Sequence, residues 1–271
     1  MSASPILRPL ERIGAGAEGF LAYLGGIGYL ALDTLGHGLA GLLFRPRIKV
    51  GETLFQMVRL GVRAVPIIML VQVFVGMTLA FTLAPVLEMY DQLEQLPVVI
   101  VKAMFPQLGP LLAAIVLTGF AGAAITAELG TMVVGEEIAA LRTSAINPIR
   151  FLVVPRVLAC LVMTVALTVL ANLVGAAGGL LISALELGLD PYQYYHTGIE
   201  ALTVKDVATG LIKGAIYGLI IVLVACYEGL TVTGGAGGVG RRTTASVVRS
   251  IFLIITANCA FTALFYFFWP E

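Results

Sequence analysis

Five long apolar runs dominate the chain, and short polar stretches separate them. The runs cover residues 64–84, 98–127, 151–185, 207–227 and 251–269. Each is about 20 residues or longer, the length that an α-helix needs to cross a bilayer. The pattern therefore predicts an all-α membrane protein with five spanning helices.

Composition supports this prediction. The 271 residues are 59% hydrophobic and 12% charged, with a mean hydropathy of +1.00, whereas soluble chains carry about 25% charged residues. The net charge is zero, so the chain has no electrostatic basis for binding nucleic acid. Cys160, Cys226 and Cys259 lie far apart in apolar runs without metal-ligand spacing, so we expect no metal site.

A sixth apolar run, residues 20–44, differs from the others because it holds Asp33 and His37 near its middle. Basic residues flank it on both sides, at Arg8, Arg12, Arg45, Arg47 and Lys49. A spanning helix would place one basic group outside, against the positive-inside rule. An interfacial or re-entrant helix would leave both basic groups inside, so we favour an interfacial helix, with a spanning helix as the alternative. Residues 1–63 would then form a cytoplasmic tail and this helix, and residues 64–271 a five-span unit.

Charges alternate in sign along the connecting stretches. Residues 85–97 and 186–206 are mainly acidic, whereas residues 128–150 and 228–250 carry arginines. Placing the basic stretches inside predicts a cytoplasmic N-terminus and an external C-terminus.

The longest polar interruption is residues 128–155. Glu136 and Glu137 precede a short helix-like segment and Arg142 ends it, an order that complements the helix dipole. We expect Asn147-Pro148 to stop this helix, because the residue before proline avoids the α region.

Ile138 and Leu141 are three residues apart, so both can point to one side of that helix. A short cytoplasmic helix with charged ends and an apolar face is suited to docking into a groove of another protein. An ordinary solvated loop is the alternative interpretation.

Two polar side chains interrupt the apolar runs. Lys213 lies in the fourth run, where an ionisable group is costly and marks a functional candidate, unless it snorkels toward the outer headgroups. Gln107 lies in MFPQLGP, residues 104–110, whose two prolines predict either a cavity wall or a plain packing kink. Met77 in the first run is a third candidate for lining the cavity.

Gly210, Gly214 and Gly218 recur every fourth residue and share one face of the fourth run. Small residues at this spacing let two helices approach closely, so we expect helix packing there. A substrate groove is the alternative.

Enzyme motifs are absent from the sequence, which contains no GxxxxGK[ST], HExxH or GxSxG pattern. GGAGGVGR, residues 234–241, follows a membrane run and lacks the lysine of a phosphate loop, so we expect a flexible loop rather than a phosphate cradle. We therefore expect neither catalysis nor a bound cofactor.

Three segments resemble the MlaE/YrbE permease family: LGPLLAAIVLTGFAGAAITAELG (residues 108–130), AELGTMVVGEEIAALRTSAINPIRFLVVPRVLA (127–159) and GGAGGVGRRTTASVVRS (234–250). The resemblance covers nearly the whole chain beyond the N-terminal tail, and it implies a membrane-embedded N-terminal elbow helix followed by five spans. It implies the non-catalytic membrane subunit of an ABC transporter that moves phospholipid or related lipid between the inner and outer membranes. The expected location is the bacterial inner membrane, with a periplasmic C-terminus.

The resemblance also implies partners. They are a second copy of the chain, a cytoplasmic ATPase dimer that binds ATP and Mg, and an outer ring of MCE-domain proteins. A coupling helix between the second and third spans would contact the ATPase. Its expected contact residues are Glu128, Glu136, Glu137, Ile138, Leu141 and Arg142. Gln107, Lys213 and Met77 become candidates for a lipid cavity.

The chain departs from better-known members at three places. Those members usually have Arg-Glu at the positions of Pro106-Gln107 and Arg at the position of Phe120. Several have an acidic residue at the position of Asn258. Lys213, in contrast, matches a lysine of some members. These departures concern the substrate more than the fold. Two other functions stay open: a stand-alone secondary lipid transporter or scramblase, and a structural membrane anchor.

Overall fold

The computed structural model describes residues 18–19, 21–36 and 50–268. These residues form helices and short connections, with no β-strand among them. Five helical segments are long and apolar enough to cross a membrane: Val50–Glu88, Leu93–Val134, Ile149–Leu185, Val204–Leu230 and Gly235–Phe268. The predicted all-α membrane fold with five spans is confirmed.

The first span is a chain of three helices, α2 (Val50–Leu60), η1 (Val62–Ala64) and α3 (Val65–Glu88). Pro66 lies in the first turn of α3, where no backbone donor is lost from the helix. The helical segment thus starts well before the predicted residue 64.

The second span is broken twice by π-helical turns, η3 (Met104–Leu108) and η4 (Thr118–Gly122). The rest of the span consists of η2 (Leu93–Gln95), α4 (Leu96–Ala103), α5 (Gly109–Leu117) and α6 (Ala123–Val134). The first break coincides with the predicted irregularity at residues 104–110, where Pro106 lacks a backbone donor. The wide turns accommodate a span that is longer than the bilayer requires.

The remaining helices follow in order. They are α7 (Glu137–Thr143), η5 (Ile149–Val153), α8 (Val154–Leu185), α9 (Pro191–Ala201), α10 (Val204–Leu230) and α11 (Gly235–Phe268). Asp190 caps α9 by accepting from the Gln193 amide at 3.2 Å, and Thr203 with Asp206 forms a capping box on α10.

The interpretation of residues 234–241 as a flexible loop is wrong, because α11 begins at Gly235. Only residues 231–234 connect α10 to α11. Gly234 (φ +87°) and Gly235 (φ +65°) occupy the left-handed region that this tight turn requires. The many glycines predict a loop, because glycine has a low helix propensity. In the structure Gly238, Val239 and Ser246 are buried, and this packing stabilises the helix in spite of that low propensity.

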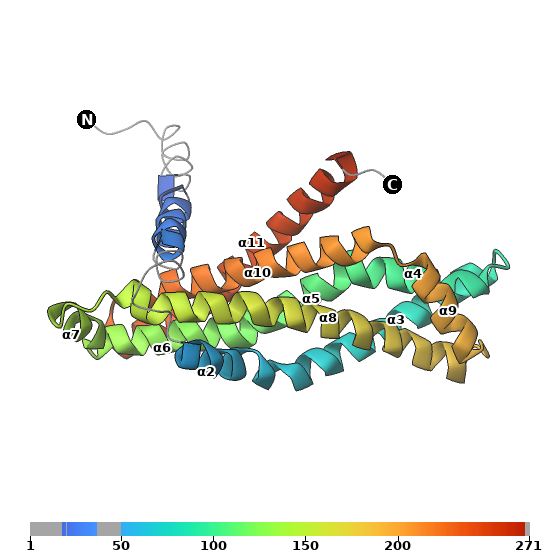
Figure 1. Cartoon of the computed structure of the whole chain (residues 1–271), viewed down its shortest axis with the longest axis horizontal. Coiled ribbons are helices and arrows are strands. Elements are labelled where there is room, and N and C mark those ends of the chain that lie inside the picture. The colour runs from blue at the N-terminus through green and yellow to red at the C-terminus, as the bar shows by residue number, and fades with distance from the viewer. Residues whose placement is uncertain (1–17, 20, 37–49, 269–271) are drawn as a thin grey trace, which may run out of the picture.

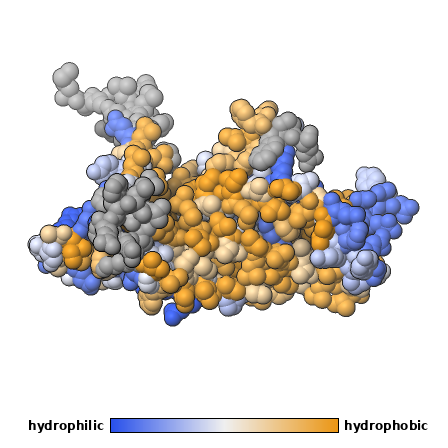
Figure 2. Space-filling view, in the orientation of Figure 1, coloured by the Kyte–Doolittle hydropathy of each residue, from blue (hydrophilic) through white to orange (hydrophobic). Residues whose placement is uncertain are grey.

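The spans lie side by side along the long axis of the molecule (Figure 1), with α7 at one end and α9 at the other. An apolar band covers the middle and hydrophilic residues gather at both ends (Figure 2), as expected for a membrane-spanning bundle. The outer half of α11 leans away from the bundle (Figure 1). This divergence leaves a face of α11 without a neighbour in the described chain.

The N-terminal helix over residues 21–36 runs across the long axis rather than along it (Figure 1), the direction expected of an elbow helix. It packs on the bundle through Leu30, which belongs to the main apolar core. The tail up to residue 17 and the basic residues 45–49 lie outside the described residues.

Candidate functional site

A hollow of about 570 Å³, here called the central hollow, opens between η3 and the diverging half of α11. Its lining residues are Gln107, Asn258, Cys259, Thr262, Ala263, Tyr266 and Phe267. Gln107 comes from the π-helical turn of the second span, and the others come from the last span. The irregular turn therefore forms part of a cavity wall.

Lys213 lies behind this lining and is 3% exposed. Its Nζ donates to Gln107 Oε1 at 2.5 Å and to Thr262 Oγ1 at 3.0 Å. Both acceptors are neutral, and no ion pair joins Lys213 to a carboxylate of the described residues. Lys213 therefore points into the protein and does not snorkel outward. A buried ammonium without a counter-charge gains free energy when an anion comes near.

Asn258 extends the polar floor of the central hollow. Its Oδ1 accepts from the hydroxyl of Tyr217, a fully buried residue, at 2.7 Å. The Thr262 hydroxyl bonds to the Asn258 carbonyl oxygen at 2.8 Å. This network is uncharged except for Lys213, so one buried positive charge lies behind the wall of the hollow.

Met77 does not reach the central hollow. It lies in α3 and packs against a separate apolar cluster around Ala80, Ile100 and Met104.

The glycine face of α10 packs against neighbouring helices. A Cβ added at Gly210 would lie 2.1 Å from the Phe105 carbonyl oxygen. One at Gly214 would lie 2.4 Å from Thr168 Oγ1, and one at Gly218 would lie 2.3 Å from Thr164 Oγ1. These distances leave no room for a side chain, so the face holds α10 against α8 and η3 rather than lining a groove.

The short helix α7 lies at the end of the bundle, between the second and third spans (Figure 1). Its capping residue Glu136 has a left-handed backbone (φ 59°), and Glu137 and Arg142 lie in its first and last turns. Both charged side chains are exposed. Ile138 is 7% exposed and packs with the half-buried Leu141 on the core of this chain. The apolar side of α7 therefore anchors the helix, and its charged side is exposed.

The helix ends at Thr143, one residue after Arg142, which agrees with the predicted end, but Asn147-Pro148 is not what stops it. Ala145 adopts a left-handed backbone (φ 58°), and the Ile146 amide donates to the Leu141 carbonyl oxygen at 2.9 Å. This is a Schellman-type end with alanine in the usual place of glycine. Asn147 instead caps the next helix by accepting from the Ile149 amide at 2.9 Å.

A second hollow, of about 340 Å³, lies at the base of α7. It is lined by residues of α6, α7 and the start of the third span: Met132, Glu137, Ala140, Leu141, Ser144 and Phe151. We call it the α7 hollow. Its mixed apolar and acidic lining is accessible at the end of the bundle.

Glu128 lies in α6 rather than on the α7 surface, which corrects its expected placement on the coupling helix. Its carboxylate pairs with Arg59 of α2 at 2.9 Å and with the buried Arg156 of α8 at 3.0 Å. Arg156 also donates to the Leu152 carbonyl oxygen at 2.7 Å. Glu128 thus joins three spans just inside the end that carries α7.

Comparison with known proteins shows to which family the chain is similar. A model of the family described as Permease MlaE matches residues 53–264. The chain belongs to the MlaE permease family. A probable ABC transporter permease protein of Rickettsia prowazekii is 33% identical over 224 residues, covering 83% of this chain and 86% of the relative.

Two further relatives come from photosynthetic organisms. A probable ABC transporter permease protein of Synechocystis is 37% identical over 216 residues, covering 80% of this chain and 82% of the relative. The chloroplastic protein TRIGALACTOSYLDIACYLGLYCEROL 1 of Arabidopsis thaliana is 34% identical over 227 residues, covering 83% and 64%. The chain is thus a multi-pass membrane protein of an ABC permease family.

Two of the three departures from better-known MlaE members meet in the central hollow. Gln107 and Asn258 both line it. Phe120 lies in the second π-helical turn, η4, and its side chain is exposed. Neutral side chains of Gln107 and Thr262 therefore contact Lys213, and Asn258 adds a further neutral group to the hollow.

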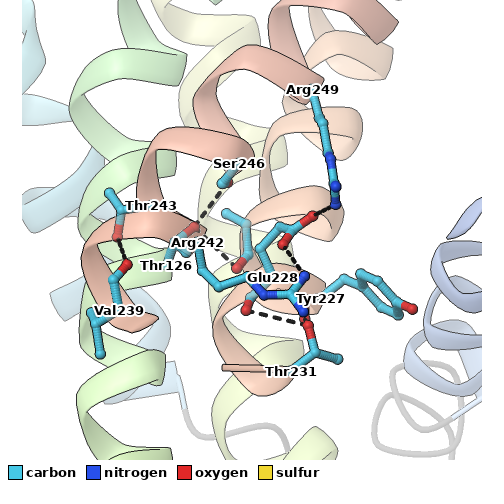
Figure 3. A network of polar contacts seen from close by, with 10 residues as sticks. Thr126, Tyr227, Glu228, Thr231, Val239, Arg242, Thr243, Ser246 and Arg249 are labelled. Atoms are coloured by element: carbon cyan, nitrogen blue, oxygen red, sulfur yellow. Dashed lines mark hydrogen bonds and ion pairs between the residues drawn. The ribbon is translucent and has the colours of Figure 1, made fainter. Parts of the chain in front are cut away.

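Sequence reasoning missed the most buried charge among the residues that the structure describes. Glu228 was assigned to a loop but lies in α10 with no exposed surface. Figure 3 shows its carboxylate between two arginines of α11. It accepts from Arg242 at 2.8 Å and pairs also with Arg249. The only signal in the sequence was an acid at the end of an apolar run, followed by arginines at 14 and 21 residues' distance.

The Glu228 cluster also reaches the N-terminal helix. The Arg249 guanidinium lies 4.5 Å from the centre of the Tyr23 ring, and the Tyr23 and Tyr227 rings meet edge to face at 5.3 Å. Burial, with the nearby Glu228 carboxylate, raises the pKa of the Tyr23 hydroxyl, so this group stays neutral. The elbow helix is therefore held near the end of α10 and the middle of α11.

Among the described residues, no group of three or more His, Cys, Asp or Glu side chains could hold a metal ion.

Proposed function

We propose that this chain is the permease subunit of an ABC transporter that moves phospholipid or a related lipid between the inner and outer membranes. One observation carries the proposal: Lys213 is buried beside the central hollow and contacts only neutral oxygens of Gln107 and Thr262. A lipid phosphate placed in the hollow would supply the missing negative charge. A bilayer-facing cavity with a single cation suits a lipid with an anionic headgroup.

The shape of the hollow supports a lipid ligand. The hydrophobic residues Tyr266 and Phe267 lie at one end of its lining, and Gln107 and Asn258 provide its polar part. A headgroup can bond to the polar part while the acyl chains remain among apolar side chains. The name of the Arabidopsis relative is that of a galactolipid, which also favours a lipid substrate.

ATP would drive transport through a partner ATPase. We propose that this ATPase docks on the exposed charges of α7, Glu137 and Arg142, and inserts into the α7 hollow. Closure of the ATPase dimer on ATP and Mg would push α7. Glu128, which pairs with Arg59 and Arg156, offers a route for this movement into three spans. The chain itself would bind no cofactor and perform no catalysis.

The assembly we propose is a homodimer in a bacterial inner membrane. Its α7 end would face the cytoplasm and its α9 end would meet an outer MCE-domain ring. Arginines at the α7 end and acids at the α9 end favour this orientation through the positive-inside rule. The transport unit would begin with the first span at Val50 rather than at residue 64, and the tail and elbow helix would precede it.

The experiment is lipid transfer in proteoliposomes that contain the complex with its ATPase, using fluorescent phosphatidylglycerol. We expect Lys213→Gln to lower the ATP-dependent transfer rate about tenfold, because one charge-assisted contact of roughly 1.5 kcal/mol is lost. Lys213→Arg keeps the charge and should retain part of the rate. The matched control is Lys205→Gln, which removes another lysine of α10 outside the hollow.

The outcomes separate the candidate functions. Transfer that proceeds without the ATPase would favour a stand-alone transporter or scramblase. If the wild-type and Lys213→Gln complexes both hydrolyse ATP and neither transfers lipid, the result would favour a structural anchor.

A further inference from the structure

A third hollow, of about 510 Å³, lies on the first half of α11. It is lined by Arg241, Thr244, Ala245, Val248 and Arg249, and we call it the arginine hollow. The spacing of three and four residues puts this set on one face of the helix. It shares no lining residue with the central hollow.

Positive charge is in excess around the arginine hollow. Arg242 and Arg249 share the single carboxylate of Glu228. Arg241 forms no ion pair in the described part of the chain. Three guanidinium groups against one carboxylate leave two positive charges in this cluster. An anion would find both charge and space there.

The position of Arg241 adds a second argument. Its Nη2 atom lies 3.1 Å from the place that a Cβ of Gly234 would occupy, at the start of α11. The start of a helix carries a partial positive charge, so an arginine beside it is repelled unless an anion binds both. The local field therefore favours a bound anionic group.

The depth of the hollow matches the headgroups of one leaflet. Arg249 and Phe268 are 19 residues apart in α11, which corresponds to about 30 Å along the helix, the thickness of the hydrocarbon core. Exposed Tyr266, Phe267 and Phe268 suit the opposite interface. The arginine hollow would then lie at the cytoplasmic headgroup level.

An apolar stripe connects the two hollows. Val248, Phe252 and Ile255 are exposed and follow one another at spacings of four and three residues. Continuing with the same spacing reaches Cys259 and Thr262 of the central hollow. One face of α11 thus carries a cationic hollow at its inner end, an apolar path, and a second hollow backed by Lys213.

We propose that the arginine hollow binds the phosphate of an anionic phospholipid from the cytoplasmic leaflet, at a station that exchanges lipid with the central hollow along α11. The apolar stripe favours a lipid over a nucleotide or free phosphate, because only a lipid needs an apolar path for its chains. This role rests on the proposed function, but the binding itself does not require transport.

The test measures lipid retention by the full-length chain in its native assembly. Nanodiscs of phosphatidylcholine with a minor share of phosphatidylglycerol supply the lipids, and native mass spectrometry counts the molecules released with the protein. Arg241→Gln should lower phosphatidylglycerol retention about fivefold, the effect of one basic residue at a membrane surface. Arg241→Lys should keep most of it. Arg63→Gln, an exposed arginine of η1, is the matched control.

Background variants keep the test specific. In a Lys213→Gln background, Arg241→Gln should cause the same fold loss, because the two sites are separate. Unchanged melting temperatures in detergent would show that the variants are folded. Equal retention by Arg241→Gln and Arg63→Gln, or equal retention of the two lipids by wild type, would overturn the proposal. Loss of bound lipid on adding inorganic phosphate alone would identify a free-anion site instead.

The two proposals can fail separately. If Arg241→Gln lowers lipid retention but the complex shows no ATP-driven lipid transfer, lipid binding by the arginine hollow is supported and the proposed transport function is refuted. If lipid transfer depends on Lys213 but lipid retention is unchanged in Arg241→Gln, only the proposed lipid binding by the arginine hollow is refuted.

Discussion

Glu228 is the one carboxylate of the described chain that has no exposed surface, and Arg242 and Arg249 hold it. Glu228→Gln would leave two arginines without a counter-charge. We expect the free energy of unfolding to fall by about 2 kcal/mol, below the usual 3–5 for a buried pair because both arginines are partly exposed. Arg242→Gln should cost less, since Glu228 keeps Arg249. Thermal melting in detergent measures both effects.

The control for this prediction is Glu88→Gln, which neutralises an exposed carboxylate at the end of α3. It should leave the melting temperature unchanged. If Glu228→Gln melted like the control, the buried cluster would contribute nothing to the fold.

Single residues were predicted better than their contacts. Gln107 and Lys213 were chosen as polar interruptions of apolar runs, and the structure brings them within 2.5 Å across 106 residues of chain. Their pairing depends on the π-helical turn at Met104–Leu108 and on the close packing at Gly210. Neither the register of a π-turn nor the crossing point of two helices can be read from periodicity.

The charged surface of α7 carries the prediction that belongs to this element. Glu137→Arg combined with Arg142→Glu reverses two exposed charges and leaves the anchoring Ile138 in place. We expect the ATPase to bind at least about tenfold more weakly, because like charges would meet across the interface. The melting temperature should fall only slightly, because the swapped charges oppose the dipole of α7 while Ile138 still anchors the helix. Affinity measured on immobilised complexes, with ATPase stimulation as a second readout, tests this.

Glu186→Arg provides the matched control, because it changes an exposed acid at the opposite end of the bundle, after α8. Its ATPase affinity should equal that of wild type. If wild type, the Glu137→Arg/Arg142→Glu variant and Glu186→Arg all bound the ATPase with equal affinity, α7 would not be the docking element.

Helix positions were predictable, whereas several helix ends were not. The apolar runs located every span, because burial in a bilayer demands long apolar segments. The end of α7 agrees with its predicted place after Arg142, but the stop was assigned to Asn147-Pro148, because Ala145 takes the left-handed position in which glycine is usual. The start of α11 was missed because tertiary contacts of Gly238 and Val239 stabilise a glycine-rich helix.

At the scale of the whole molecule, α11 packs on the bundle with one face and leaves the opposite face without a neighbour in the described chain. The central hollow, the apolar stripe and the arginine hollow all lie along α11. In the homodimer we propose, a second copy would enclose these faces between two protomers. A lipid could then move along α11 without meeting bulk water.

A spin label on Cys259 can test this arrangement, because Cys259 is exposed whereas Cys160 and Cys226 are buried. The wild-type chain needs no added cysteine, and Cys259→Ser should take up no label. In nanodiscs, electron–electron double resonance should detect two coupled spins per particle. Trapping the ATPase with ATP and vanadate should shift the distance between them, since the central hollow would open or collapse.

A signal from one spin per particle would refute the homodimer. A two-spin signal that ATP and vanadate leave unchanged would instead show that α11 does not move with the ATPase. Because Cys259 lies next to Asn258, one turn before Thr262, the label reports on the wall that Lys213 contacts. The distance shift would therefore connect ATP hydrolysis at one end of the bundle to the central hollow.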